Sequence, residues 1–504
     1  MSTSTSTASE PIVAVDLFCG GGGLSTALAE ACEALNRPVE LYAINHDTTA
    51  IETHTRNHPW ATHLNAHIEA LHPSNIVEPG TVDILIAAPE CTHFSTARGG
   101  KPVNPQLRAS PMHVLDWIGK LQPTAVLLEN VPEFQDWGPV IDGKPSRDGS
   151  KFEAWKTQLE ADRYSVQHTV LNAADYGDVT SRRRFFVMAR RDYQPEFPDP
   201  THSKHGDKPG TEPWLPAAEI LDWSDLGDTI WTRSRPLANN TMQRIAEGIR
   251  EHCDDRLTPY ADLIGEFTPE DVKRMQDDIV PVADLATAVE SRNSPFLVKG
   301  IAPGDDESKV SSTMVMGQHS GAKAKAASES PLPTIATRGA IHYINVDPFI
   351  LPRNGAFRGI HSNPTYNPED RPLHTVTARN HDGHLVWPFL VEYPSDEAVD
   401  QGVNREKSHT TVERYALCAP DLYPLGLDLR YRMLQPPELA AAQGFPDDYD
   451  FAGNKTETTK QIGNAVPVNL GKALVMQLLQ PTTQPTVSRF TNPGTASSGD
   501  VADD

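Results

Sequence analysis

The sequence predicts an α/β fold in which an open, largely parallel sheet carries helices on its faces and a nucleotide-like ligand at one edge. Three observations lead to this fold class. Short apolar or β-branched runs recur between residues 11 and 192 and alternate with helical stretches. The first run ends in four successive glycines, a turn that lets a ligand approach the backbone closely. Several later runs end abruptly in polar side chains, which open sheets gather at their carboxyl edge.

Composition argues against several classes of protein. The chain has 504 residues but no apolar run of about 18 residues, so we expect no membrane span. The N-terminus lacks the basic and apolar regions of a secretory signal. Cysteines without paired spacing argue against a disulfide framework or a structural zinc and are typical of a reducing cytoplasm. They are Cys19, Cys32, Cys91, Cys253 and Cys418.

The net charge of −23, from 67 acidic and 44 basic residues, weighs mildly against a nucleic-acid partner. Binding follows the local potential, however, and the basic residues are unevenly spread. Arg182-Arg183-Arg184 is followed closely by Arg190-Arg191. A nucleic-acid partner therefore stays open.

The first strand is expected over Ile12 to Leu17, and a helix begins near Ser25 after the glycines. A strand, a glycine turn and a helix form the first unit of a nucleotide-binding sheet, although a plain tight turn is the alternative. The pattern alone does not choose between NAD, FAD and S-adenosylmethionine. Asp16 and Phe18 favour the last, because an acid can meet its α-amino group and an aromatic ring can stack on adenine.

A second strand, Leu41 to Ile44, is followed by Asn45, His46 and Asp47, which are candidates for contacts with a ribose or adenine. Asp47 fits a helix N-cap equally well. After a third apolar segment, His67 either contacts adenine or is an exposed loop residue.

The next buried strand begins at Ile84 and leads into Pro89-Glu90-Cys91. A lone buried cysteine is most often an inert small hydrophobe. Cys91, however, stands between polar residues where a strand stops, which is where a reactive thiolate forms.

A further strand, Ala125 to Leu128, ends at Glu129. A buried carboxylate there is destabilising unless it is paired or kept for chemistry; a helix cap or a salt bridge is the alternative. A strand from Ser165 to Leu171 and a later apolar strand flank the triple arginine. Period-two alternation points Arg182 and Arg184 one way and Arg183 the other.

Residues 191–370 lose this rhythm. A helix is expected over Met242 to Arg250, and three echoing segments (295–298, 348–351 and 388–391) indicate short β units of a second, smaller domain. A capped helix is expected within 434–446, and a final helix is expected to begin at 463 and run through Leu479.

The order of these motifs resembles the DNA (cytosine-5)-methyltransferases, in a prokaryotic or phage form with a Pro-Glu-Cys variant of the catalytic motif. The resemblance covers about 11–190 and 371–480. The matching segments are Asp16-Leu17-Phe18-Cys19-Gly20-Gly21-Gly22-Gly23, Pro89-Glu90-Cys91, Glu129-Asn130-Val131, Thr180-Ser181-Arg182-Arg183-Arg184, Arg371-Pro372-Leu373-His374-Thr375 and Gln461-Ile462-Gly463-Asn464-Ala465-Val466.

The resemblance implies a Rossmann-like S-adenosylmethionine-dependent methyltransferase sheet with a second, smaller, mainly β target-recognition domain. We expect a catalytic and cofactor-binding domain over 11–192, a target-recognition region over 193–425, and a return segment over 426–480 that completes the catalytic domain. The tails 1–10 and 481–504 are expected to be disordered.

The resemblance also implies roles for single residues. The catalytic set is Cys91, Glu129, Arg182 and Arg184. The expected S-adenosylmethionine-binding residues are Asp16, Phe18, Gly20, Gly22, Gly23, Leu24, Asn45, His46, His67, Ile68, Pro89, Asn464 and Ala465. Glu90, Thr92 and Thr180 depart from the family pattern, as do Asn45 and His67, where the family usually has acids near the ribose and adenine.

The activity implied is methyl transfer from S-adenosylmethionine to C5 of a cytosine flipped out of double-stranded DNA, through a covalent Cys91 adduct. A cytoplasmic monomer without a metal is expected, with a cognate restriction endonuclease as a candidate partner. The alternatives are RNA as substrate, transfer of a modified methyl group, a non-catalytic DNA-binding homologue, or a dinucleotide oxidoreductase favoured only by the glycine loop.

Overall fold

We analysed a computed structural model of the chain. It describes residues 10–89, 110–141, 144–301, 313–317, 325–326, 341–345, 347–352, 356–357, 360–361, 364–378, 383–392, 413–423 and 425–480. The expected nucleophile, Cys91, lies outside the described residues, as do the two terminal tails apart from residue 10.

The first sheet has seven strands in the order β3-β2-β1-β4-β5-β9-β8. The strands are β1 (Ile12–Leu17), β2 (Val39–Asn45), β3 (Thr62–Asn65), β4 (Ile84–Ala87), β5 (Ala125–Asn130), β8 (Ser165–Asn172) and β9 (Arg183–Arg190). Strands β1 to β5 run parallel, and β9 is antiparallel to both β5 and β8. The expected open α/β sheet is therefore present, with all carboxyl ends of β1 to β5 at one edge.

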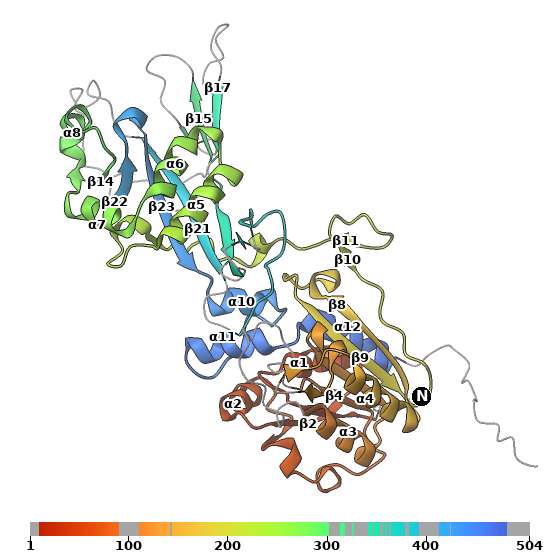
Figure 1. Cartoon of the computed structure of the whole chain (residues 1–504). Helices are drawn as coiled ribbons and strands as arrows, with labels where there is room; N and C mark the ends of the chain where they lie inside the picture. Colours follow the sequence, from red (N-terminus) through yellow and green to blue (C-terminus); the bar gives the residue numbers. More distant parts are fainter. Residues whose placement is uncertain are drawn as a thin grey trace, which may run out of the picture.

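Helices cover both faces of this sheet (Figure 1). They are α1 (Gly23–Ala34), α2 (Thr48–Asn57), α3 (Ser110–Leu121), α4 (Ser150–Ala161) and α12 (Val468–Leu479). Alternate residues of one strand serve opposite faces, because side chains of a strand point to either side in turn. Leu85 packs in the core with Trp117 of α3, whereas Ile84 packs in the core with Leu474 of α12.

A second sheet has the strand order β13-β14-β22-β23-β21-β18, and β12 pairs with β23. These strands are β12 (Asp228–Thr229), β13 (Val280–Pro281), β14 (Phe296–Ile301), β18 (Phe349–Pro352), β21 (Gly383–Glu392), β22 (Glu413–Cys418) and β23 (Leu425–Met433). The three echoing segments lie in β14, β18 and β21 of this one sheet, as short β units.

Helices also pack on this second sheet, which the sequence indicated only in part. They are α5 (Asn239–His252), α6 (Thr258–Glu266), α7 (Pro269–Asp277) and α8 (Leu285–Ser291). Helices α5 to α7 share a core with Leu297, whereas α8 shares one with the neighbouring Phe296 on the other face. The unit is thus a sheet with helices on both faces, and it forms the upper lobe in Figure 1.

The described residues also contain the remaining, mostly short strands. They are β6 (Val140–Ile141), β7 (Lys144–Pro145), β10 (His202–Ser203), β11 (Glu212–Pro213), β15 (Thr313–Gly317), β16 (Lys325–Ala326), β17 (Ile341–Asn345), β19 (Ala356–Phe357) and β20 (Ile360–His361).

The chain leaves the second sheet later than expected. Strand β23 pairs with β21 and β22 up to Met433, so the boundary expected after residue 425 cuts a strand of that sheet. The stretch expected to form one final helix also contains parts of two helices. Helix α11 (Lys455–Asn464) is capped at its C-terminal end by Ala465, and α12 starts after Pro467. Proline lacks an N–H and disfavours helical backbone in the residue before it, which separates the two helices. Helix α10 (Pro436–Ala442) precedes them.

Candidate active site

The ends of β4 and β5 lie side by side. The two strands are parallel with Ala87 opposite Leu128, so the chain beyond β4 runs along the end of β5. There the Asn130 side-chain amide donates to the carbonyl oxygen of Pro89 over 3.1 Å. The same side chain accepts from the backbone N–H of Val131. Pro89, two residues before Cys91, is therefore fixed beside Glu129, although Cys91 itself lies outside the described residues.

Glu129 is buried and paired. Its side chain is 9% exposed, and its Oε1 lies 3.1 Å from Nε of Arg184. Burial raises the pKa of the Glu129 carboxyl above its usual value, and the charges of Arg184 and Arg182 oppose that rise. The salt bridge that the sequence left as an alternative is therefore present.

The arginines of the triplet face different surroundings. Arg183 is exposed, whereas Arg182 and Arg184 are shielded, as period-two alternation predicted. Arg182 is 2% exposed, and its Nη1 donates to the carbonyl oxygen of Val376 over 2.8 Å. Arg182 therefore holds the segment 371–378, whereas Arg184 holds Glu129. That either arginine also contacts a base stays a prediction.

The segment 371–378 lies against two other motifs. Ser181 N–H donates to Leu373 O over 2.8 Å, and Leu373 N–H donates to Val179 O over 3.0 Å. On its other side, a Cβ placed on Gly463 would overlap the backbone of Thr377. Three motifs that are far apart in the sequence therefore meet, and Arg184 at the end of one of them pairs with Glu129.

The glycine loop between β1 and α1 has left-handed backbone at Phe18, Gly20 and Gly22, with φ of 63°, 54° and 95°. A Cβ on Gly22 would overlap the Tyr449 hydroxyl, and one on Gly23 would overlap the backbone of Val466. Gly20 differs, because the nearest atom of the described residues lies 3.9 Å from such a Cβ. Gly22 and Gly23 thus have no room for a side chain because the return segment packs against them, whereas approach of a ligand to their backbone stays a prediction.

Asp16 lies inside the fold. It is 0% exposed, and its Oδ2 accepts from the Ser25 hydroxyl over 2.6 Å. Its Oδ1 is buried and has no hydrogen-bond partner among the described residues. Burial raises the pKa of Asp16 to about 7. Contact of this carboxylate with the α-amino group of a ligand, as the sequence suggested, stays a prediction.

Polar residues follow β2 and β3 at the same edge. Asp47 caps α2, accepting from Thr49 N–H over 3.0 Å and from Ala50 N–H over 3.3 Å, so the alternative interpretation of this residue is confirmed. Asn45 is half-buried and accepts from Asp47 N–H. The rings of His46 and His67 stack with their centroids 4.4 Å apart and 9° between planes. Both imidazoles are exposed at this edge.

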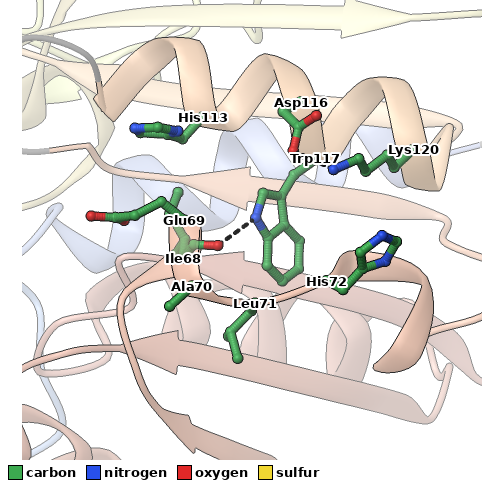
Figure 2. Close-up of a pocket in the computed structure, with 9 residues that line it drawn as sticks. All are labelled: Ile68, Glu69, Ala70, Leu71, His72, His113, Asp116, Trp117 and Lys120. Atoms are coloured by element: carbon green, nitrogen blue, oxygen red, sulfur yellow. Dashed lines mark hydrogen bonds and ion pairs between the residues drawn. The ribbon is translucent and has the colours of Figure 1, made fainter.

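Ile68 lies in the core just beyond His67, at the start of the 3-10 turn Ile68–Ala70. Its carbonyl oxygen accepts from the indole N–H of Trp117 over 3.2 Å (Figure 2). A cavity of about 350 Å³ opens between this turn and α3, with His72, His113, Asp116 and Lys120 on its rim. Among the described residues that line it, Ile68 is the one member of the expected cofactor-binding set, and no residue of the glycine loop takes part.

The expected cofactor-binding residues fall into two groups. Those with open or partly open surface are Phe18, Gly20, Asn45, His46, His67 and Asn464. Those that are buried are Asp16, Gly22, Gly23, Leu24, Ile68, Pro89 and Ala465. The open group supplies an aromatic ring, an uncovered backbone and stacked imidazoles along adjacent strand ends, which fits a nucleoside-containing cofactor. The buried residues support the backbone that carries this open surface.

Sequence reasoning missed Tyr449 and His58, whose side chains lie under the glycine loop. The hydroxyl of Tyr449 donates to Gly21 O over 2.6 Å and lies 3.4 Å from Nε2 of His58. Residues 391 positions apart have no spacing pattern that could have linked them.

In the described part of the chain, no group of three histidine, cysteine or carboxylate side chains is arranged to hold a metal ion. Among the same residues, no helix combines the length and apolar character needed to cross a membrane.

The chain is similar to proteins of a known family. Residues 12–480 match the family model described as C-5 cytosine-specific DNA methylase. The type II methyltransferase M.AgeI of Thalassovita gelatinovora is 26% identical over 489 residues, covering 91% of this chain and 97% of the relative. M1.BsuMI of Bacillus subtilis, another type II methyltransferase, is 31% identical over 200 residues, covering 37% of this chain and 44% of the relative.

Solved structures similar to the chain include a DNMT2 mutant from Spodoptera frugiperda, with a TM-score of 0.45 and 15% identity. That match covers 93% of this chain and 99% of the other. The Dnmt2 methyltransferase of S. pombe has a TM-score of 0.44 and 14% identity, covering 93% and 98% of the two chains.

The family model spans nearly the whole chain, including the two strand ends that hold Pro89 and Glu129. The chain therefore belongs to the C-5 cytosine-specific DNA methylase family and is a DNA cytosine methyltransferase.

Proposed function

We propose that this enzyme transfers a methyl group from S-adenosylmethionine to C5 of a cytosine flipped out of double-stranded DNA, using Cys91 as a covalent nucleophile. The observation that supports this most is the position of Glu129. It is a buried acid of raised pKa, paired with Arg184, beside the strand end that leads to Cys91.

The proposed first step is addition of the Cys91 thiolate to C6 of cytosine. Carbon C5 is too weak a nucleophile by itself, and the new S–C6 bond moves an electron pair toward C5 and the ring nitrogen N3. After C5 has gained the methyl group, its proton leaves to solvent and the electron pair of the C5–H bond re-forms the double bond. The S–C6 bond breaks in the same step and restores the thiolate.

Glu129 is proposed to hold the proton that N3 receives and to take it back from N3 when the product ring re-forms. A carboxylic acid can donate only while it is protonated, and burial favours that neutral form. Arg184 orients the carboxyl through its 3.1 Å contact and keeps its pKa from rising further. Arg182 acts indirectly, because its hydrogen bond to Val376 O fixes the segment 371–378.

S-adenosylmethionine, when bound, supplies the methyl group as an activated electrophile. The residues proposed to hold it are those with open surface at the strand ends: Phe18, Gly20, Asn45, His46, His67 and Asn464. The stacked imidazoles of His46 and His67 offer a flat face near the ends of β2 and β3, where adenine or ribose groups bind in such sheets. The buried members, from Asp16 to Ala465, keep this surface in shape.

We assign DNA recognition to the second lobe, which carries the sheet from β12 to β23. A base must leave the duplex to reach a catalytic group, so a protein surface must hold the remaining DNA. In this proposal the chain acts as a cytoplasmic monomer, and the type II names of its relatives suggest pairing with a restriction endonuclease.

The direct test is transfer of radiolabelled methyl groups to duplex DNA and, separately, to transfer RNA. We expect labelled 5-methylcytosine in DNA only, detected after enzymatic digestion, and bisulfite sequencing would give the target site. Label in RNA alone would replace the DNA proposal with the RNA alternative. No label in either, with protein that remains folded, would favour a non-catalytic homologue.

A further inference from the structure

We propose that Tyr449 and His58 are positioning residues, which fix the peptides of the glycine loop in the orientation that cofactor binding requires. The inference rests on the proposed cofactor, but it concerns side chains that the proposal does not use. Tyr449 comes from the return segment between α10 and α11, and His58 follows α2. Together they join the two ends of the chain beneath the loop.

Two hydroxyl groups donate hydrogen bonds to consecutive carbonyl oxygens of the loop. The Tyr449 hydroxyl donates to Gly21 O over 2.6 Å, and the Thr26 hydroxyl donates to Gly22 O over 2.8 Å. His58 Nε2 lies 3.2 Å from the Thr26 hydroxyl oxygen and 3.4 Å from that of Tyr449. His58 is 4% exposed, so these contacts are shielded from water.

These contacts determine the tautomer of His58. A hydroxyl has one hydrogen, and here each hydroxyl uses it on a glycine carbonyl oxygen. The ring nitrogen that faces both hydroxyl oxygens must therefore be the donor. His58 is thus neutral with its hydrogen on Nε2, and burial lowers its pKa to about 4, which keeps it neutral at ordinary pH.

Fixing the carbonyl oxygens also fixes the donors of the loop. In a trans peptide the C=O and N–H point in opposite directions. With the oxygens of Gly21 and Gly22 held toward Tyr449 and Thr26, the N–H groups of Gly22 and Gly23 are turned the other way. The N–H of Gly22 donates to Cys19 O over 3.0 Å and closes the turn, whereas Gly23 is the first residue of α1, where N–H groups favour an anionic group such as a carboxylate.

The position of Tyr449 does not depend on its hydroxyl. The next residue, Asp450, exchanges two backbone hydrogen bonds with the Asn57 side chain, each of 2.9 Å. Ala452 N–H also donates to the Thr53 hydroxyl over 2.9 Å. Removing the Tyr449 hydroxyl alone should therefore leave the return segment docked on α2 and take away only the hydroxyl that fixes the Gly21 carbonyl oxygen, while Gly22 N–H still donates to Cys19 O.

The test compares Tyr449→Phe with Tyr164→Phe in the full-length protein. Tyr164 is a matched control, because its hydroxyl also donates to a backbone carbonyl, that of Pro123, over 2.6 Å. It is buried in the core on the α3 side of the sheet, away from the loop. We measure S-adenosylmethionine binding by calorimetry, KM for cofactor and for DNA, and thermal unfolding.

We expect Tyr449→Phe to weaken S-adenosylmethionine binding about tenfold, in line with the loss of one buried hydrogen bond. The KM for cofactor should rise in parallel, whereas the KM for DNA should not. Tyr164→Phe should lower the melting temperature to a similar extent without changing cofactor affinity. A Tyr449→Phe protein that binds cofactor as the wild type does would overturn the inference.

The same experiment separates this inference from the proposed function. If the wild-type protein binds no S-adenosylmethionine, the cofactor proposal itself fails. If the wild type binds it and both tyrosine variants lose affinity equally, the loss reflects general destabilisation, and the positioning role is refuted while the cofactor proposal stands.

Discussion

The Nε atom of Arg184 lies 3.1 Å from Oε1 of Glu129, and both side chains are largely shielded from water. Burial pushes the pKa of the carboxyl up, and the guanidinium pulls it back. A carboxyl whose pKa is raised by burial and lowered by a neighbouring positive charge is typical of a catalytic acid, because such a group must keep a proton and still release it.

Replacing Glu129 with Gln should abolish most of the methyl transfer without unfolding the protein. The amide has nearly the same shape but cannot supply a proton, and general acid catalysis contributes about 10²–10⁴-fold. We expect kcat to fall by about that factor while cofactor binding is kept. The control is Glu153→Gln on the exposed face of α4, whose rate should not change. Equal rates for Glu129→Gln and wild type would remove Glu129 from the mechanism.

The rate should fall as pH rises through the pKa of Glu129. Its folded-state pKa lies above the usual value of 4.5, so the active protonated form is complete at low pH and is lost on the alkaline side. Arg184 lowers this pKa, so Arg184→Met should move the alkaline limb of the single-turnover rate to higher pH while reducing the maximum. A limb that moves to lower pH would contradict the pairing.

Gly22 should tolerate no side chain. Its φ is 95°, and an added Cβ would overlap the Tyr449 hydroxyl, so Gly22→Ala adds a steric clash to the cost of a left-handed backbone. Gly80→Ala is the matched control, since Gly80 has φ of 82° with nothing within 4 Å of a Cβ. By urea denaturation we expect a loss of about 1 kcal/mol for Gly80→Ala and at least about 2 kcal/mol for Gly22→Ala. Equal losses would show that the loop is not closely covered.

His58 should make the fold sensitive to acid. Its folded-state pKa of about 4 is below the ordinary 6.5, so protons bind preferentially to the unfolded chain. Stability is complete above pH 6.5 and declines as pH falls toward about 4. Between pH 7.5 and pH 5 this residue should account for about 2 kcal/mol of the loss. His58→Gln keeps a donor and does not titrate, so its unfolding free energy should decline less over that range. An identical decline would show that His58 is not buried neutral.

The sequence predicted the first sheet well because its strands are short, apolar and closed by strong turn signals, as at Gly20 after β1. It also predicted that Arg182 and Arg184 share a side, because alternation is a local property of strands. It could not show that Asp16 points into the fold, since the partner of its carboxylate is fixed by how α1 packs.

The long-range contacts were beyond sequence reasoning for the same physical reason. That Gly22 and Gly23 are covered by Tyr449 and Val466 depends on docking of the return segment, which leaves no periodic signal near the loop. The break between α11 and α12 could have been found, because Pro467 is a local signal that disfavours helix in Val466.

The most direct test of the account is covalent trapping by duplex DNA that carries 5-fluorocytosine at the methylated position. Fluorine at C5 cannot leave as a proton does, so an S–C6 bond formed by Cys91 should persist. With S-adenosylmethionine present, we expect a DNA adduct of the wild-type protein that survives denaturing electrophoresis, and none of Cys91→Ser. An adduct that still forms with Cys91→Ser, or a wild type that methylates ordinary DNA yet is never trapped, would contradict the account.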